Sequence, residues 1–69
     1  METYLIMITE EVGGTSQPYM LASSFNEAHE LVRNRIKYTG KVPACVDLYI
    51  QYNGTFQLRT PSMFISEVA

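Results

Sequence analysis

The sequence predicts an α+β fold, in which one helix packs on one face of a mainly antiparallel sheet of four to five strands. Three observations lead to this expectation. Two alternating β-like runs open the chain, a stretch with helical spacing follows, and further alternating runs complete it. The element order is therefore ββαββ, or ββαβββ if the last run is also a strand. The 69 residues suit a single compact domain, 1–69.

The first two strands are predicted on either side of a loop that is rich in glycine and small polar residues. Residues 3–10, TYLIMITE, alternate between a face with tyrosine and isoleucine and a face with leucine, methionine and threonine. Residues 11–17 supply the loop. Residues 18–23 form a short second strand, which Pro18 can begin because a proline cannot donate inside a ladder.

The helix is predicted from a change of period at Ser24. Ser24 and Glu27 form a capping box, in which the hydroxyl accepts from the amide of Glu27 and the carboxylate reaches back to the cap. Gly40 ends the helix, and Pro43 prevents its continuation. The apolar stripe that should face the sheet contains Phe25, Ala28, Leu31, Val32 and Ile36.

The last part of the chain predicts a hairpin between residues 44–52 and 55–60. A two-residue Asn53-Gly54 turn is the common choice, but it would place the apolar sets of the two strands on opposite faces. A three-residue loop with a bulge at Gly54 instead puts Phe56 and Leu58 on the helix-covered face. Because burying such a side chain is worth about 1.5–3 kcal/mol, we expect this second register. A β-like run over 62–68 follows.

The sheet face without a helix is the predicted binding surface. Tyrosine, methionine and arginine are enriched at protein interfaces. Leu5 beside Tyr49 would also leave an apolar patch that is unusual for a free monomer. An ordinary solvated sheet face with cross-strand pairs is the alternative. The candidate partner-binding residues are Met7, Asp47, Tyr49, Gln51, Gln57 and Arg59.

No catalytic set is recognisable. Cys45 and His29 are the one available nucleophile and base, and nothing in the sequence brings them together. One cysteine and one histidine cannot form a structural zinc site. The loop over 13–16 lacks the following helix and the lysine of a phosphate cradle. Asp47 is expected to pair with Arg59 or another neighbour. We therefore predict a non-enzymatic protein without catalytic residues, metal ligands or cofactor.

The charge composition favours a protein partner over nucleic acid. Five basic residues stand against seven acidic ones, for a net charge of −2, which argues against a nucleic-acid binder. A lone cysteine, the absence of a secretory signal and the absence of a membrane-spanning stretch predict the cytoplasm. A homodimer stays open, because a domain of this size gains stability by association.

The layout resembles that of small phage-encoded anti-CRISPR proteins. The corresponding pieces are YLIMITEEV, SSFNEAHELVRNR and VDLYIQYNGTFQL. The resemblance implies an inhibitor of a host defence complex that acts by steric occlusion in the host cytoplasm. The alternative is a small-ligand or nucleotide-binding protein, with a dimer allowed, whose site combines the Gly13-Gly14 loop with exposed tyrosines.

Overall fold

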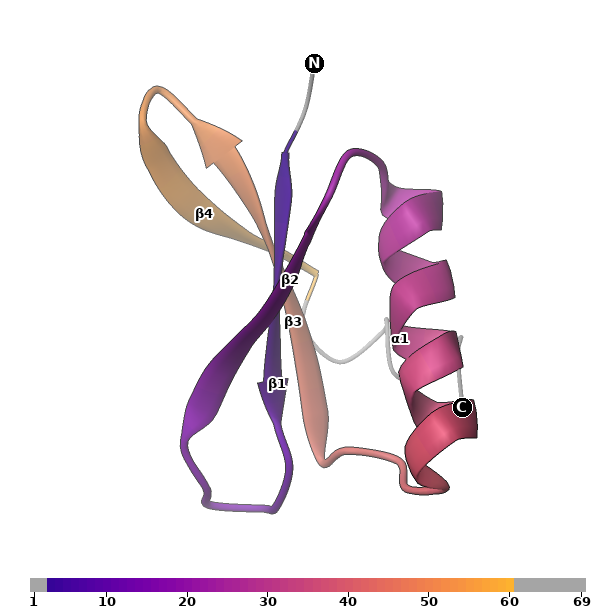
Figure 1. The fold of residues 1–69 in the computed structure, drawn as a ribbon. Helices are drawn as coiled ribbons and strands as arrows, with labels where there is room; N and C mark the ends of the chain where they lie inside the picture. The colour runs from indigo at the N-terminus through magenta and orange to yellow at the C-terminus, as the bar shows by residue number, and fades with distance from the viewer. Residues whose placement is uncertain (1–2, 61–69) are drawn as a thin grey trace.

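The computed structural model describes the backbone of residues 3–60 and the side chains of residues 3–58. Its elements are β1 (Tyr4–Thr9), β2 (Ser16–Ala22), α1 (Phe25–Thr39), β3 (Cys45–Tyr52) and β4 (Thr55–Thr60) (Figure 1). The strands form one antiparallel sheet in the order β2-β1-β3-β4. The predicted α+β layout is confirmed. The run expected over 62–68 lies outside the described residues.

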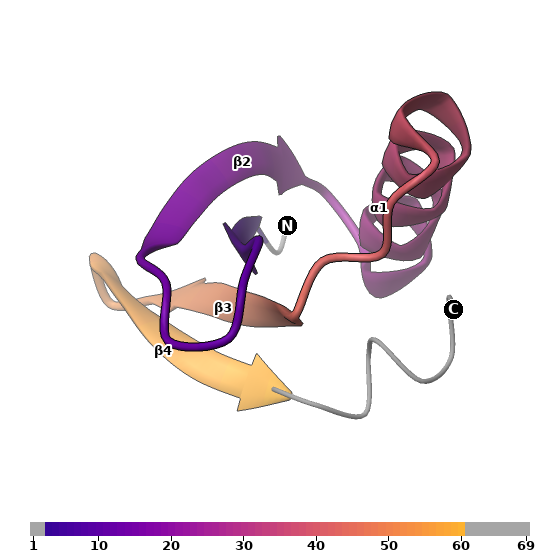
Figure 2. The same cartoon turned by 90° about the horizontal axis from the view of Figure 1, so that it is seen from below.

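The core lies between the sheet and α1. Figure 2 views the sheet from below and shows α1 on one side of the strands. The predicted stripe of α1 faces the sheet: Ala28 and Val32 are fully buried, and Phe25, Leu31 and Ile36 pack against the core at its margin. The buried apolar side chains are Tyr4, Ile6, Ile8, Ala22, Ala28, Val32, Val46 and Leu48.

Both ends of α1 lie where the sequence predicts them. The hydroxyl of Ser24 accepts from the backbone N–H of Glu27 at 3.0 Å. The Glu27 carboxylate accepts from the backbone N–H of Ser23 at 2.9 Å, one residue before the cap and not at Ser24 itself. At the other end Gly40 has φ 72°, and its N–H donates to the carbonyl of Ile36 at 2.8 Å.

The predicted register of the last hairpin is wrong. Tyr52 pairs directly with Thr55, so the turn has two residues and not three. Asn53 has φ 51° and Gly54 has φ 81°, and positive values at both positions are the mark of a type I′ turn. Such a turn matches the right-handed twist of the strands that it joins. A bulge does occur, but at the far end of β4, where Arg59 is the extra residue.

The position of α1 explains why burial did not select the other register. The helix packs over β1 and β2, while β4 lies at the opposite edge of the sheet. A side chain of β4 on the helix-facing side would therefore gain little contact with α1. With that gain reduced, the local preference of Asn53-Gly54 decides the register. Phe56 and Leu58 consequently lie on the helix-free side, opposite Gln51 and Tyr49.

Candidate functional site

The helix-free side of the sheet, which we call the open face, is more apolar than the sequence led us to expect. Alternation and pairing bring side chains from all four strands to this side. Leu21 lies opposite Leu5 on one flank, and Leu58 lies opposite Tyr49 on the other. The described side chains of the open face include Leu5, Met7, Leu21, Cys45, Asp47, Tyr49, Gln51, Phe56 and Leu58.

A hollow of about 190 Å³ lies within the open face and is lined by Leu5, Met7, Tyr49 and Phe56. The first three of these side chains are half-buried, and Phe56 is 42% exposed. The flanking Leu21 and Leu58 are 58% and 49% exposed. The open face is therefore a contiguous apolar surface with a depression, and not a ladder of polar cross-strand pairs.

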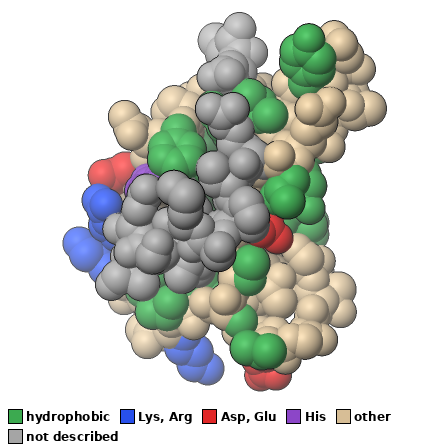
Figure 3. All heavy atoms as spheres, turned by 180° about the vertical axis from the view of Figure 1, so that it is seen from behind, with side chains coloured by type: hydrophobic (Ala, Val, Ile, Leu, Met, Phe, Trp, Pro, Cys, Tyr) green, Lys and Arg blue, Asp and Glu red, His purple; other side chains and the backbone are tan. Residues whose placement is uncertain are grey.

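Charge is distributed unevenly over the molecule. The basic residues among the described side chains come from α1 and the segment after it: Arg33, Arg35, Lys37 and Lys41. In the view from behind (Figure 3), the Lys and Arg side chains lie toward α1, where a carboxylate also lies, and further carboxylates and hydrophobic side chains are seen away from it. Among the described side chains the open face thus carries one carboxylate, Asp47, and no cation.

The structure brings together four of the six predicted binding residues. Met7 and Tyr49 line the hollow, and Asp47 and Gln51 follow on the same side of β3. The prediction that Gln57 lies on the open face is wrong. Gln57 pairs with Ile50, so the two-residue turn places it on the helix-facing side. Arg59 contributes the extra backbone residue of the bulge, and its side chain lies outside the described ones.

Sequence reasoning missed the apolar contributions of β4 to the open face. It assigned Phe56 and Leu58 to the core because their burial seemed worth more than a turn preference. The signal that could have found them is the Asn53-Gly54 pair itself, which favours the two-residue turn.

Cys45 and Asp47 interact with each other at one end of the open face. The Cys45 thiol donates to Asp47 Oδ1, with 3.4 Å between Sγ and the oxygen. Burial raises the pKa of Cys45, and the hydrogen bond to Asp47 and its negative charge raise it further. A raised pKa keeps the thiol protonated, which is unfavourable for a nucleophile. Among the described side chains, Asp47 therefore pairs with a neighbour on its own face, which is one of the two arrangements expected from the sequence.

Cys45 and His29 do not form a nucleophile–base pair. His29 lies on α1, where its ring stacks at 45° against Phe25 with 4.7 Å between centroids. Cys45 is on the same side of β3 as Asp47, which is the side away from α1. The sheet therefore separates the two groups.

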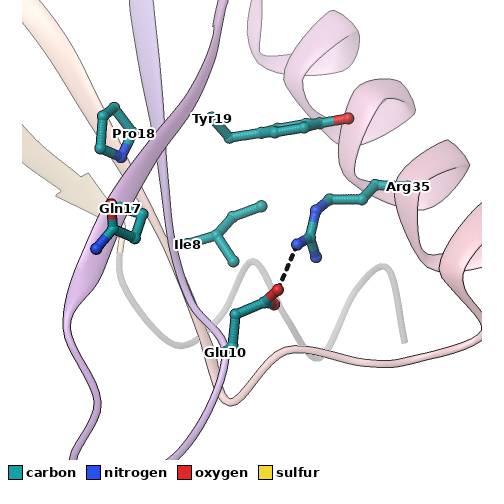
Figure 4. A pocket seen from close by; sticks show the side chains of 6 residues that line it. All are labelled: Ile8, Glu10, Gln17, Pro18, Tyr19 and Arg35. Carbon is teal, nitrogen blue, oxygen red and sulfur yellow. Dashed lines mark hydrogen bonds and ion pairs between the residues drawn. The ribbon is translucent and has the colours of Figure 1, made fainter.

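A second, smaller hollow of about 110 Å³ lies between the edge of the sheet and α1 (Figure 4). Arg35 reaches across it from α1, and its Nη2 donates to Glu10 Oε2 at 2.6 Å. The guanidinium carbon lies 5.5 Å from the centroid of the Tyr19 ring, within the range of a cation–π contact. The complete lining is Ile8, Glu10, Gln17, Pro18, Tyr19 and Arg35.

This second hollow serves cohesion better than ligand binding. The hydrogen bond from Arg35 is the main cause that lowers the pKa of Glu10, so the pair is ionised and mutually satisfied. The hollow is well below the roughly 300–1,000 Å³ of ordinary small-molecule pockets. In the loop that contains Gly13 and Gly14, the N–H of Gly14 donates to the carbonyl of Glu11 at 2.8 Å, so the loop forms a hydrogen-bonded turn. These contacts pair Arg35 with Glu10, and Gly14 with Glu11, within the chain.

Comparison with known proteins identifies no relative of this chain, since no protein-family model, curated protein or solved structure matches it. Within the described residues, no group of three His, Cys, Asp or Glu side chains is placed to hold a metal ion. No helix in that same part of the chain is long and apolar enough to span a membrane.

Proposed function

We propose that this chain is a non-enzymatic protein-binding module that covers a partner's surface with its open face. The observation that carries the proposal is the apolar hollow on the side of the sheet that α1 does not cover. Contiguous exposed apolar surface of this kind marks interaction sites, because its removal from water is favourable. Tyr49 and Met7 in the hollow are residue types that interfaces favour. The action is steric occlusion of the surface that is covered.

The charges of the open face indicate the chemistry of the partner. Asp47 is its carboxylate, and the described cations lie elsewhere. A complementary surface is therefore apolar where it meets the hollow, and neutral or basic where it approaches Asp47. Negatively charged surfaces such as nucleic acid are disfavoured for the same reason.

The proposed partner is a host defence complex, and the chain acts as a phage or mobile-element inhibitor. This identification rests on the layout resemblance to small anti-CRISPR proteins. A sheet face that occludes a protein surface needs no catalytic residue and no cofactor, which fits the separation of Cys45 from His29. The site of action would be the cytoplasm of the host.

Site-specific photocross-linking in the host tests the binding face. A benzophenone amino acid replaces Tyr49 in one variant and Tyr38, which is 93% exposed on α1, in the control. We expect one protein to be cross-linked from position 49 and not from position 38, and to form a binary complex when purified. Cross-linking that is equal at both positions contradicts the proposed face.

A plaque assay tests the proposed partner class. Expression of the chain in a host that is immune to a phage through a CRISPR system should restore plaque formation. The Tyr49→Ser variant, if folded, should restore it less. Unchanged immunity, together with a position-49 partner unrelated to defence, would retain the binding module and reject the inhibitor.

A further inference from the structure

The two edges of the sheet differ in their capacity to accept another strand. In β2, Pro18 has no N–H to donate, and Tyr19 is an extra residue that interrupts the pairing with β1 between Ile6 and Met7. Proline and bulges are devices that block edge pairing. In β4, Thr55–Leu58 pairs with β3 without interruption and contains neither proline nor charge. Within residues 3–60, Thr55–Leu58 of β4 is therefore the edge segment that is suitable for addition, and the bulge at Arg59 ends it.

The outward backbone groups of β4 can be assigned from the pairing. The N–H of Gln51 donates to the carbonyl of Thr3 at 2.9 Å, so this residue directs its backbone toward the β1 side. Its partner across the ladder, Phe56, is then in a non-hydrogen-bonded pair, and its N–H and C=O point away from β3. The same holds two residues later for Leu58. Tyr52 and Thr55 form the hydrogen-bonded pair that closes the turn.

The residues with outward backbone groups also carry their side chains on the open face. Phe56 lines the hollow, and Leu58 flanks it. In an antiparallel ladder, residues directly opposite each other have side chains on the same side. A strand that bonds to Phe56 and Leu58 would therefore extend the apolar surface of the open face. The intervening Thr55 and Gln57 are exposed and polar on the other side.

We propose that β4 accepts an extended segment of the partner protein by β-strand addition, with Phe56 and Leu58 as the bonding residues. The segment alternates apolar residues, which face the side of the hollow, with polar residues that face the side of Gln57. Main-chain hydrogen bonds supply affinity in this mode, and the alternating side chains supply specificity. The inference rests on the proposed function and specifies how the partner engages the open face.

A peptide probe with amide hydrogen exchange tests the proposal. The probe is a capped ten-residue peptide in which four valines alternate with four threonines between terminal lysines, and its control has the four valines in succession. We expect the alternating peptide to slow exchange of the Phe56 and Leu58 amides about tenfold. The inward amide of Gln57 should already be slow, and its exchange rate should not change. The control peptide should protect neither outward amide.

Backbone N-methylation provides the matched variants. The chain can be assembled from residues 1–44 and 45–69, because Cys45 supplies the thiol for native ligation. Methylation of the Leu58 nitrogen removes an outward donor, and we expect it to weaken peptide binding about tenfold while the chain stays folded. Methylation of Gln57 removes an inward donor and should instead lower the melting temperature.

The outcomes separate this inference from the proposed function. The peptide, or the partner cross-linked at position 49, could bind while the Phe56 and Leu58 amides keep the exchange rates of the free chain. That result would contradict strand addition and leave the proposed binding through the open face intact. If both amides are protected in the free chain, the edge is already occupied and the heterologous segment is rejected; loss of that protection on dilution would identify the occupant as a second copy. Protection of both amides in the cross-linked partner complex supports the proposal.

Discussion

Phe56 lies opposite Gln51 in the ladder between β3 and β4, on the side of the sheet away from α1. This pairing makes the sheet face more apolar than the bulged register would, because it adds a phenylalanine and then Leu58 to the surface around Tyr49. The same pairing leaves the backbone groups of Phe56 pointing outward. One register thus determines both the character of the open face and the availability of its edge.

The open face should contribute more to binding than to stability. The double variant Phe56→Thr/Leu58→Thr places β-branched residues, which strands favour, at both positions and removes two partly exposed apolar side chains. We expect a loss of unfolding free energy of about 1 kcal/mol or less per site, and a loss of partner affinity of about 30-fold or more. Urea denaturation and titration of the cross-linked partner measure the two effects.

Two controls delimit that prediction. Leu48→Ala, in the buried core, should cost about 2–5 kcal/mol. Tyr38→Ser, on the exposed side of α1, should change neither stability nor binding. Wild-type affinity in the double variant would show that β4 takes no part in the interface.

Gly54 should be required by its backbone conformation alone. Its φ is 81°, and a Cβ built there meets nothing within 4 Å, so the cost of Gly54→Ala is conformational and not steric. We expect a loss of about 1 kcal/mol, measured by urea denaturation. Asn53→Gly, at φ 51°, keeps the left-handed region accessible and serves as the control. Equal stability of Gly54→Ala and wild type would contradict a type I′ turn.

The pair between Glu10 and Arg35 should make stability depend on pH in the acid range. The pKa of Glu10 is lowered in the fold from a reference value of 4.5, chiefly by the hydrogen bond from Arg35. A lowered folded pKa means that the stabilisation is present above the unfolded pKa and is lost as the pH falls through the folded one. Melting temperatures measured from pH 6 downward should therefore fall less steeply for Glu10→Gln than for wild type.

Salt provides an independent check of that assignment. Because Glu10 is largely exposed, screening should reduce the difference between Glu10→Gln and wild type at neutral pH. Glu30→Gln, whose partner Arg33 lies at 3.7 Å and is also exposed, is the matched control with a smaller effect. Parallel pH profiles for Glu10→Gln and wild type would remove Glu10 from this role.

Cys45 should be a slow thiol in the folded chain. Its pKa is raised by burial and by Asp47, so a smaller thiolate fraction is available near pH 8.5 than for a free cysteine. Alkylation by iodoacetamide should be slower in native protein than in urea. Asp47→Asn should accelerate the native reaction without reaching the unfolded rate, because burial remains. Native alkylation at the unfolded rate would contradict the contact at 3.4 Å.

Local signals in the sequence were sufficient for the elements themselves. Ser24 and Gly40 mark the ends of α1, and the structure places its bounds at Phe25–Thr39. Period-two alternation predicted which residues of β1 and β3 face the helix, and Ile6, Val46 and Leu48 are fully buried. These features depend on a few neighbouring residues, so hydrogen bonding and periodicity within one segment are enough to specify them.

The surface that the protein presents was decided only by the tertiary structure. Whether Phe56 gains by facing α1 depends on which strands the helix covers, and α1 packs over β1 and β2 while β4 lies at the far edge. Burial is a property of this arrangement and not of the strand alone, so the apparent gain from the bulged register was not available. Local patterns in the sequence specify the elements, their order and the Asn53-Gly54 turn. The packing of α1 left the register to the preference of the turn, which adds Phe56 and Leu58 to the uncovered side of the sheet.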